Sequence, residues 1–128
     1  MYTNPDKMEK INQLSNKLIG LVFNCYNSIG HGFSEKVYQN IYSELLNQNN
    51  IVFQKEKYAK LLKFGKVVGR YRVDFLVENS IVVELKCRKE IYTKDIAQVL
   101  NYLKTNNVKL GLIFCFTKKN VLIKRLLN

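Results

Sequence analysis

Residues 70–86 read RYRVDFLVENSIVVELK, and this stretch decides the fold. Two apolar runs lie on either side of a Glu-Asn-Ser cluster, and polar clusters of this kind form tight turns. We therefore expect two antiparallel strands, the first over residues 67–77 and the second over residues 81–87. Both runs carry apolar side chains on both faces, which is typical of strands at the centre of a sheet.

Charged residues interrupt these two strands at positions that face one another. Successive side chains of a strand alternate between its faces, so Glu84 and Lys86 point to the same side of the sheet. A tight turn places Asp74 roughly opposite Glu84, to within one residue of register. Two carboxylates this close repel each other unless they share a proton or a cation, and a single lysine neutralises only one of them.

A hard divalent cation would remove this repulsion. Mg²⁺ prefers oxygen ligands and keeps several waters, so Asp74, Glu84 and the Leu85 carbonyl are candidate ligands. The cation would lower the pKa of a bound water, while Lys86 would orient that water or stabilise a leaving phosphate. The spacing of Asp74, Glu84 and Lys86 alone favours an ordinary cross-strand ion pair on a solvated face. The apolar residues on both faces of these strands favour instead charged side chains that are paired or bound to a metal.

The rest of the chain predicts helices and further strands around this hairpin. Apolar residues at spacings of three and four predict helices over residues 6–29, 34–49 and 93–105. The apolar stripe of the second helix is Val37, Ile41 and Leu45. Strand-like runs cover residues 51–58, 61–64 and 110–116, and residues 121–127 form a last strand or a short helix. We expect a single domain over residues 1–128, an α/β layer sandwich around a mixed sheet.

The chain is strongly basic, with 21 Lys and Arg against 10 Asp and Glu and a formal net charge of +11. Such an excess favours polyanionic partners, above all nucleic acid, although a lysine-rich composition can also serve solubility alone. The candidate nucleic-acid contacts, which lie around the hairpin and the third helix, are Arg70, Arg72, Arg88, Lys89, Lys94 and Tyr102. A solvated basic face with core tyrosines is the alternative interpretation of this cluster.

Cysteine and histidine usage excludes several other classes of site. The three cysteines, Cys25, Cys87 and Cys115, have no CxxC spacing, which favours buried thiols in a reducing compartment over a disulfide framework or a zinc site. His31 is the single histidine, so a histidine-based metal site is not expected. No stretch has the length of a transmembrane helix, and residues 1–6 are polar where a secretory signal needs an apolar run. We expect a soluble cytoplasmic protein that does not bind a membrane.

Five segments form an ordered set of motifs along nearly the whole chain. They are residues 32–38 (GFSEKVY), 69–74 (GRYRVD), 83–86 (VELK), 97–103 (AQVLNYL) and 111–113 (GLI). This set resembles the PD-(D/E)XK nuclease superfamily, and within it the small GxxExxY (GxxExxR) branch. The resemblance implies a restriction-endonuclease-like αβββαβ core with a mixed central sheet flanked by helices. The catalytic set that it implies is Glu35, Asp74, Glu84, Lys86 and Gln98.

The resemblance implies an enzyme that hydrolyses nucleic-acid phosphodiester bonds, with DNA preferred over RNA and little sequence specificity. The expected cofactor is Mg²⁺, for which Mn²⁺ can substitute. The alternative is a catalytically weak or inactive nucleic-acid-binding module, or a subunit of a repair or defence assembly. A homodimer would offer a duplex more surface than one small domain does. The chain departs from the pattern of the family at three positions, which carry Tyr26, His31 and Asp95 where relatives have histidine, proline and histidine.

Overall fold

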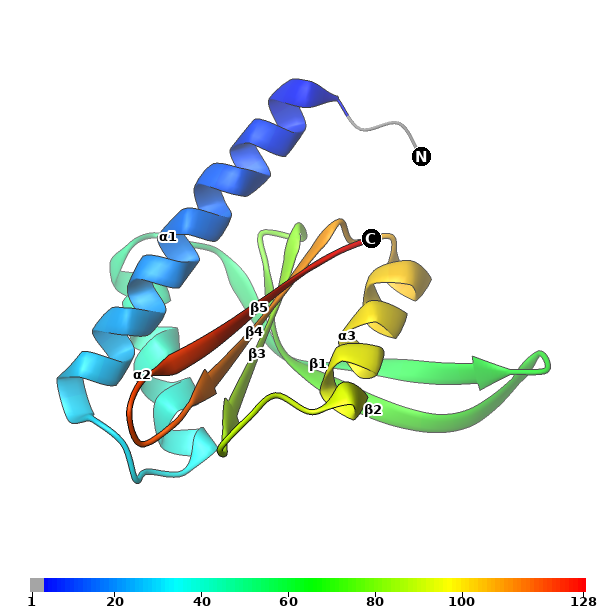
Figure 1. Cartoon of the computed structure of the whole chain (residues 1–128). Coiled ribbons are helices and arrows are strands. Elements are labelled where there is room, and N and C mark those ends of the chain that lie inside the picture. The colour runs from blue at the N-terminus through cyan, green and yellow to red at the C-terminus, as the bar shows by residue number, and fades with distance from the viewer. Residues whose placement is uncertain (1–3) are drawn as a thin grey trace.

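A computed structural model describes residues 4–128, and their eight helices and strands form three layers (Figure 1). In chain order they are α1 (Pro5–Ile29), α2 (Glu35–Gln48), β1 (Phe53–Lys63), β2 (Lys66–Val77), β3 (Ile81–Cys87), α3 (Thr93–Asn106), β4 (Leu110–Phe116) and β5 (Val121–Leu127). The segment considered above for a secretory signal lies partly outside this range. Within it, no helix is both long enough and apolar enough to cross a membrane.

The five strands in the described part of the chain form one sheet in the order β1-β2-β3-β4-β5. β3 and β4 are parallel and are connected by α3, while the other neighbouring pairs are antiparallel. This mixed sheet flanked by helices confirms the expected restriction-endonuclease-like fold. The structure differs from the sequence prediction in two details. Residues 121–127, predicted as a strand or a short helix, form a strand, and the two separate runs predicted over residues 51–64 form one continuous strand.

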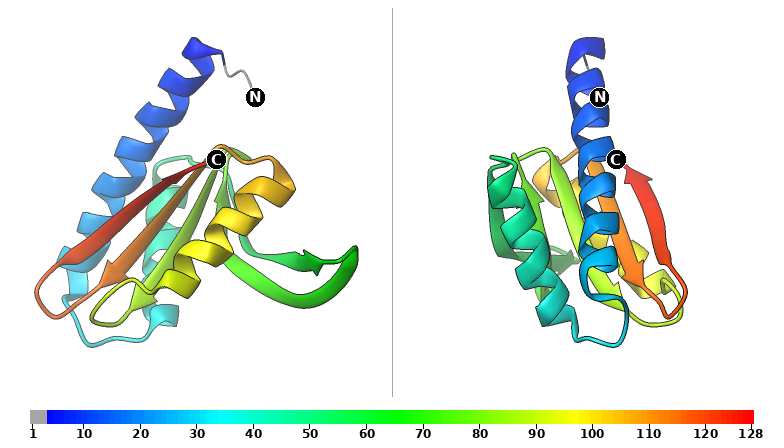
Figure 2. Two further views of the ribbon diagram at one scale, coloured as in Figure 1. Left: turned by 45° about the vertical axis from the view of Figure 1, so that its right-hand side comes forward. Right: turned by 90° about the vertical axis from the view of Figure 1, so that its left-hand side faces the viewer.

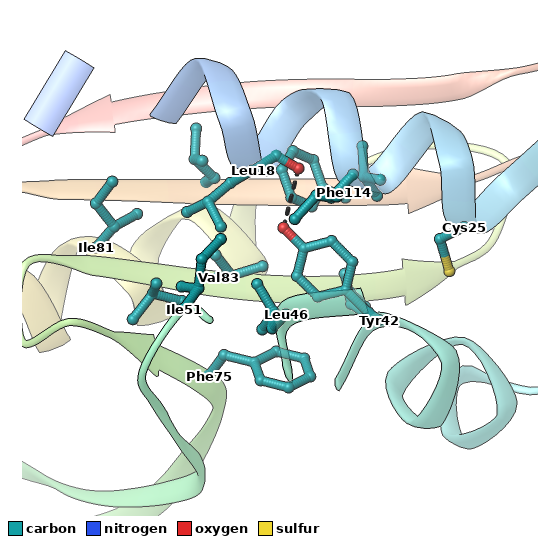
Figure 3. Packing of buried hydrophobic residues seen from close by; sticks show 14 of the residues in the cluster. Leu18, Cys25, Tyr42, Leu46, Ile51, Phe75, Ile81, Val83 and Phe114 are labelled. Atoms are coloured by element: carbon teal, nitrogen blue, oxygen red, sulfur yellow. Dashed lines mark hydrogen bonds between the residues drawn. The ribbon is translucent and has the colours of Figure 1, made fainter. Parts of the chain in front are cut away.

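The helices cover both faces of the sheet and bury two separate apolar clusters. α1 and α2 pack on one face, and α3 packs on the other (Figures 1 and 2). On the first face, Figure 3 shows Leu18, Phe75 and Phe114 around Tyr42, whose hydroxyl donates to the Leu18 carbonyl at 3.0 Å. On the second face α3 approaches β4 closely at Gly111, where an added Cβ would lie 2.6 Å from a Val99 methyl carbon.

The buried face of α2 differs from the predicted one. Val37 is 36% exposed, and Ile41 and Leu45 are only partly buried at the edge of the first cluster. The buried residues of α2 are Tyr38, Gln39, Tyr42, Ser43 and Leu46. Tyrosine rings fill the space above the sheet, and the Tyr42 hydroxyl finds a partner in the backbone of α1, so burial leaves no polar atom unsatisfied there.

β1 and β2 extend beyond the other strands as a two-stranded arm (Figures 1 and 2). The ladder between β2 and β3 runs only from Val77↔Ile81 to Phe75↔Val83, so the part of β2 before Asp74 pairs with β1 alone. The ladder between β1 and β2 is also interrupted at Asp74, where Glu56 takes a φ of 55°, in the left-handed region. β2 therefore separates from β3 at Asp74, and we call this point the fork.

Candidate active site

The carboxylate of Asp74 lies between the two strands at the fork. Its Oδ2 accepts the backbone N–H of Leu85 at 2.8 Å, and its Oδ1 accepts the side-chain Nε2–H of Gln39, also at 2.8 Å. In return, the backbone N–H of Asp74 donates to Glu84 Oε1 at 2.6 Å. Only 7% of Asp74 and 5% of Glu84 is exposed. The fork thus brings together two buried carboxylates, each bonded to the backbone of the other strand.

Burial sets the electrostatics of this pair. It raises the pKa of Asp74 to about 6, and together with the nearby charge of Asp74 it raises the pKa of Glu84 to about 8. Lys86 and the backbone N–H donors act in the opposite direction. Glu35, half-buried at the start of α2, raises the pKa of both groups further through its charge. The negative charge of Glu35 therefore acts on the same two carboxyl groups that Lys86 stabilises.

Lys86 lies between two acidic groups. Its Nζ is 3.7 Å from Glu84 Oε2 and 3.9 Å from Asp95 Oδ1, and its side chain is 18% exposed. Asp95, on the first turn of α3, also accepts from Arg88 Nη1 at 2.6 Å and from the Tyr92 backbone N–H at 2.9 Å. Asp95 is thereby held in one position and keeps the lysine ammonium beside the carboxylate pair.

Gln39 and Asp95 are site residues that sequence reasoning missed. The signal for Gln39 is its position four residues after Glu35, which places the two side chains on one face of α2. The signal for Asp95 is its place as the third residue of α3, where a carboxylate typically accepts the N–H of the residue that caps the helix.

Gln98 is exposed and contacts none of these groups by a hydrogen bond within residues 4–128. It lies three residues from both Asp95 and Asn101, and Asn101 donates to the Tyr71 hydroxyl at 2.8 Å. Because residues three apart share a helix face, Gln98 lies on the side of α3 that contacts β2 and β3 near the fork.

The residues predicted to bind nucleic acid occupy three different environments. The exposed ones are Arg70 and Arg72 on the arm and Lys89 and Lys94 beside the fork. Arg88 is half-buried, with its guanidinium 4.3 Å from the Tyr92 ring centre and bonded to Asp95. Tyr102 is 2% exposed and packs in the cluster under α3, so it cannot contact nucleic acid from this position. That prediction was wrong because the tyrosine ring serves the core.

The donor set at the fork suits a hard divalent cation. Within residues 4–128, no group of three or more His, Cys, Asp or Glu side chains is arranged to hold a metal ion. Mg²⁺ needs less than this, since it is often held by one or two carboxylates and keeps several waters. Asp74 and Glu84 supply two buried carboxyl groups whose pKa values are raised mainly by burial, and a bound cation would favour their charged forms.

Comparison with known proteins agrees with this arrangement. The family model described as the PD-(D/E)XK nuclease superfamily matches residues 12–126. A solved structure titled "Crystal structure of SSO0001" matches with a TM-score of 0.55 and 18% sequence identity, over 73% of this chain and 50% of that one. At this identity the likeness shows the fold alone, and the chain spans half the length of that structure. No match was found among the curated proteins. The narrower GxxExxY branch stays a prediction.

Proposed function

Because the chain belongs to the PD-(D/E)XK nuclease superfamily, we propose that it is a nuclease that hydrolyses DNA phosphodiester bonds with Mg²⁺, or with Mn²⁺ in its place. The observation that carries this proposal is the buried carboxylate pair at the fork with Lys86 beside it. Ordinary surface ion pairs are solvated, whereas this set is buried and hydrogen-bonded to the backbone, and burial raises the pKa of both carboxyl groups.

Each side chain of the set has a role in this proposal. Asp74 and Glu84, with the Leu85 carbonyl, would hold the cation. A bound divalent cation supplies Lewis-acid stabilisation of phosphate charge and a water of lowered pKa. Lys86 directs its ammonium group at the charge that develops on the phosphate, and Asp95 keeps it in place. Burial of the pair strengthens these electrostatic interactions relative to those in bulk water.

The exposed basic residues around the fork support nucleic acid as the substrate. Arg70 and Arg72 lie on the arm, Lys89 follows the end of β3, and Lys94 is in the first turn of α3. Lysine and arginine bind phosphates without reading bases, so these residues would position the backbone with little sequence preference. Affinity should fall steeply with salt, because each neutralised phosphate releases counterions.

A cleavage assay with matched variants tests the proposal. Purified protein is incubated with single- and double-stranded DNA and RNA in the presence of Mg²⁺, Mn²⁺ or EDTA. We expect cleavage of DNA that EDTA abolishes and that Glu84→Gln lowers about 100-fold or more, since the lost charge stabilisation amounts to several kcal/mol. Glu44→Gln, an exposed carboxylate on α2, should leave the rate unchanged. Cleavage by Glu84→Gln at the wild-type rate would contradict the proposal.

A second candidate function is nucleic-acid binding without cleavage. It is favoured by the contacts of Asp74, because both of its oxygens already accept hydrogen bonds from protein donors, as in a purely structural carboxylate. Under this alternative, binding would be tight, sensitive to salt and indifferent to divalent cations. The same preparations, tested for binding with and without Mg²⁺, separate the two functions.

A further inference from the structure

A cavity of about 520 Å³ opens beside the fork and has no role in the chemistry described so far. It is lined by residues 31–33 before α2, by Tyr38, by residues 87–89 at the end of β3 and by residues 116–119 at the end of β4 and in the turn to β5. Its volume falls within the roughly 300–1,000 Å³ range of ligand pockets in proteins. The ends of two neighbouring parallel strands form one wall, and the start of α2 forms another.

The floor of this cavity is aromatic. The rings of Tyr38 and Phe116 are stacked, with centroids 4.1 Å apart and planes at 7°, and both residues are buried. Phe33 meets Tyr38 edge-on at 6.4 Å and is itself 46% exposed. Cys87 is half-buried and also lines the cavity. A flat aromatic ligand could therefore stack on the exposed Phe33 ring and contact the apolar surface formed by Tyr38 and Phe116.

The rim of the cavity is basic. It carries Arg88, Lys89, Lys118 and Lys119, and none of the described residues that line the cavity is acidic. Lys89, Lys118 and Lys119 are exposed, so their ammonium groups can meet a ligand at the opening. An aromatic floor beneath a rim of positive charge complements a nucleotide, which joins a flat base to an anionic phosphate.

Two shared residues connect the cavity to the carboxylate pair. Asp95 binds both Lys86, which lies beside Glu84, and Arg88, which lines the cavity. Glu35, which begins α2, lies in sequence between Phe33 and Tyr38, and both of these residues line the cavity. The cavity and the carboxylates are therefore neighbours, within reach of one nucleic-acid strand.

We propose that this cavity holds one unpaired base of a nucleic-acid strand while an adjacent phosphodiester lies at the carboxylate pair. The substrate class that follows is single-stranded nucleic acid, or a duplex with an unpaired end. A base inside a duplex is stacked on both faces and paired at its edge, so it would have to leave the stack to enter. The proposal rests on the nuclease function proposed above, whose site it extends.

Binding measured in EDTA tests the pocket separately from catalysis. The probe is a fluorescent single strand of about 12 nucleotides, compared with the same strand carrying an abasic site and with a blunt duplex of equal length. Phe33→Ala should weaken binding of the intact single strand about 5-fold to 100-fold, the equivalent of one lost base–aromatic stack. Phe23→Ala, on α1, is the matched control, since Phe23 is 42% exposed and lies outside the cavity.

A double-mutant cycle makes the assignment specific. With the abasic site scanned along the strand, one position should weaken wild-type binding and add no further loss in Phe33→Ala, because both changes remove the same contact. Equal loss of single-strand and duplex affinity in Phe33→Ala would overturn the proposal, as would affinity equal to that of the wild type. Lys118→Gln, at an exposed position of the rim, gives a second readout. It should reduce by about one the number of counterions released when the single strand binds, as measured from the salt dependence of affinity.

These outcomes differ from failure of the nuclease proposal. If no substrate is cut with Mg²⁺ or Mn²⁺ but Phe33→Ala still loses single-strand affinity selectively, the cavity holds a base and the catalytic proposal fails. If DNA is cut at the same rate by wild type and Phe33→Ala, with equal KM for single strands, the catalytic proposal stands and the base pocket is refuted.

Discussion

Replacing Gln39 with leucine tests the contact that supports Asp74. The Gln39 side chain is 6% exposed, and it donates to Asp74 Oδ1 at 2.8 Å. Leucine is similar in size and has no donor, so the change removes the hydrogen bond without opening a large cavity. Within residues 4–128, the Asp74 carboxylate then keeps the Leu85 N–H as its remaining hydrogen-bond donor.

The size of the effect depends on the charge of Asp74. A hydrogen bond to a charged group contributes about 1.5–3 kcal/mol, and a neutral one contributes about 0.5–1.5 kcal/mol. Burial raises the pKa of Asp74 to about 6, so the carboxyl group is mainly charged at about pH 8 and mainly neutral at about pH 5. We expect Gln39→Leu to lower the free energy of unfolding by about 2 kcal/mol at the higher pH and by about 1 kcal/mol at the lower.

Urea unfolding in EDTA, followed by circular dichroism at both pH values, measures this difference. If the free energy of unfolding falls by about 2 kcal/mol per molar urea, the loss of about 2 kcal/mol expected at about pH 8 lowers the urea concentration at the unfolding midpoint by about 1 M. Gln48→Leu is the matched control on the same helix, because its side chain is exposed and lies 3.5 Å from the Glu44 carboxylate. The reasoning is refuted if both pH values give the same shift for Gln39→Leu, or if the control shifts equally.

Three further predictions concern the carboxyl pair, Gly111 and Asp95. Burial raises the pair's pKa values to about 6 and 8, so the folded protein holds protons that the unfolded chain releases above about pH 4. Without metal, thermal stability should therefore fall as pH rises through these values, and Mg²⁺ at about pH 8 should restore it. Gly111→Ala places a methyl group 2.6 Å from Val99 and should lower the urea-derived free energy of unfolding by about 1–3 kcal/mol, whereas Gly20→Ala, with open space around it, should not lower it. Asp95→Asn removes the charge that holds Lys86 and should lower kcat about 10-fold to 100-fold in nuclease assays, with KM little changed.

The hairpin at the fork could be predicted from local sequence. Both of its strands are apolar, the turn between them is short, and side chains alternate, so these features together set Asp74 opposite Glu84. The helix over α3 and the strand after it follow from the same kind of pattern, because a parallel neighbour needs a crossover connection.

Contacts between distant segments could not be predicted in this way. Gln39 and Asp74 are 35 residues apart, and only the packing of α2 on the sheet brings them together. The buried face of α2 was also predicted wrongly from hydrophobicity, because valine at position 37 is more apolar than the tyrosines at positions 38 and 42. In the structure Tyr42 is buried instead, because its ring fills a larger space and its hydroxyl donates to a backbone carbonyl.

The hydrogen bond from the Leu85 amide to Asp74 Oδ2 also determines which substitution at position 74 would remove activity without changing the backbone structure of the site. Leu85 is fully buried, and alanine at position 74 would leave its amide without a partner, at a cost of about 1–3 kcal/mol. β2 could recover that loss by moving a backbone carbonyl toward β3, which would close the fork and redirect the arm. Asparagine keeps an oxygen where the Leu85 amide donates, while its NH2 group replaces the oxygen that accepts from Gln39. Asp74→Asn therefore removes the charge while the side chain continues to hold the two strands apart.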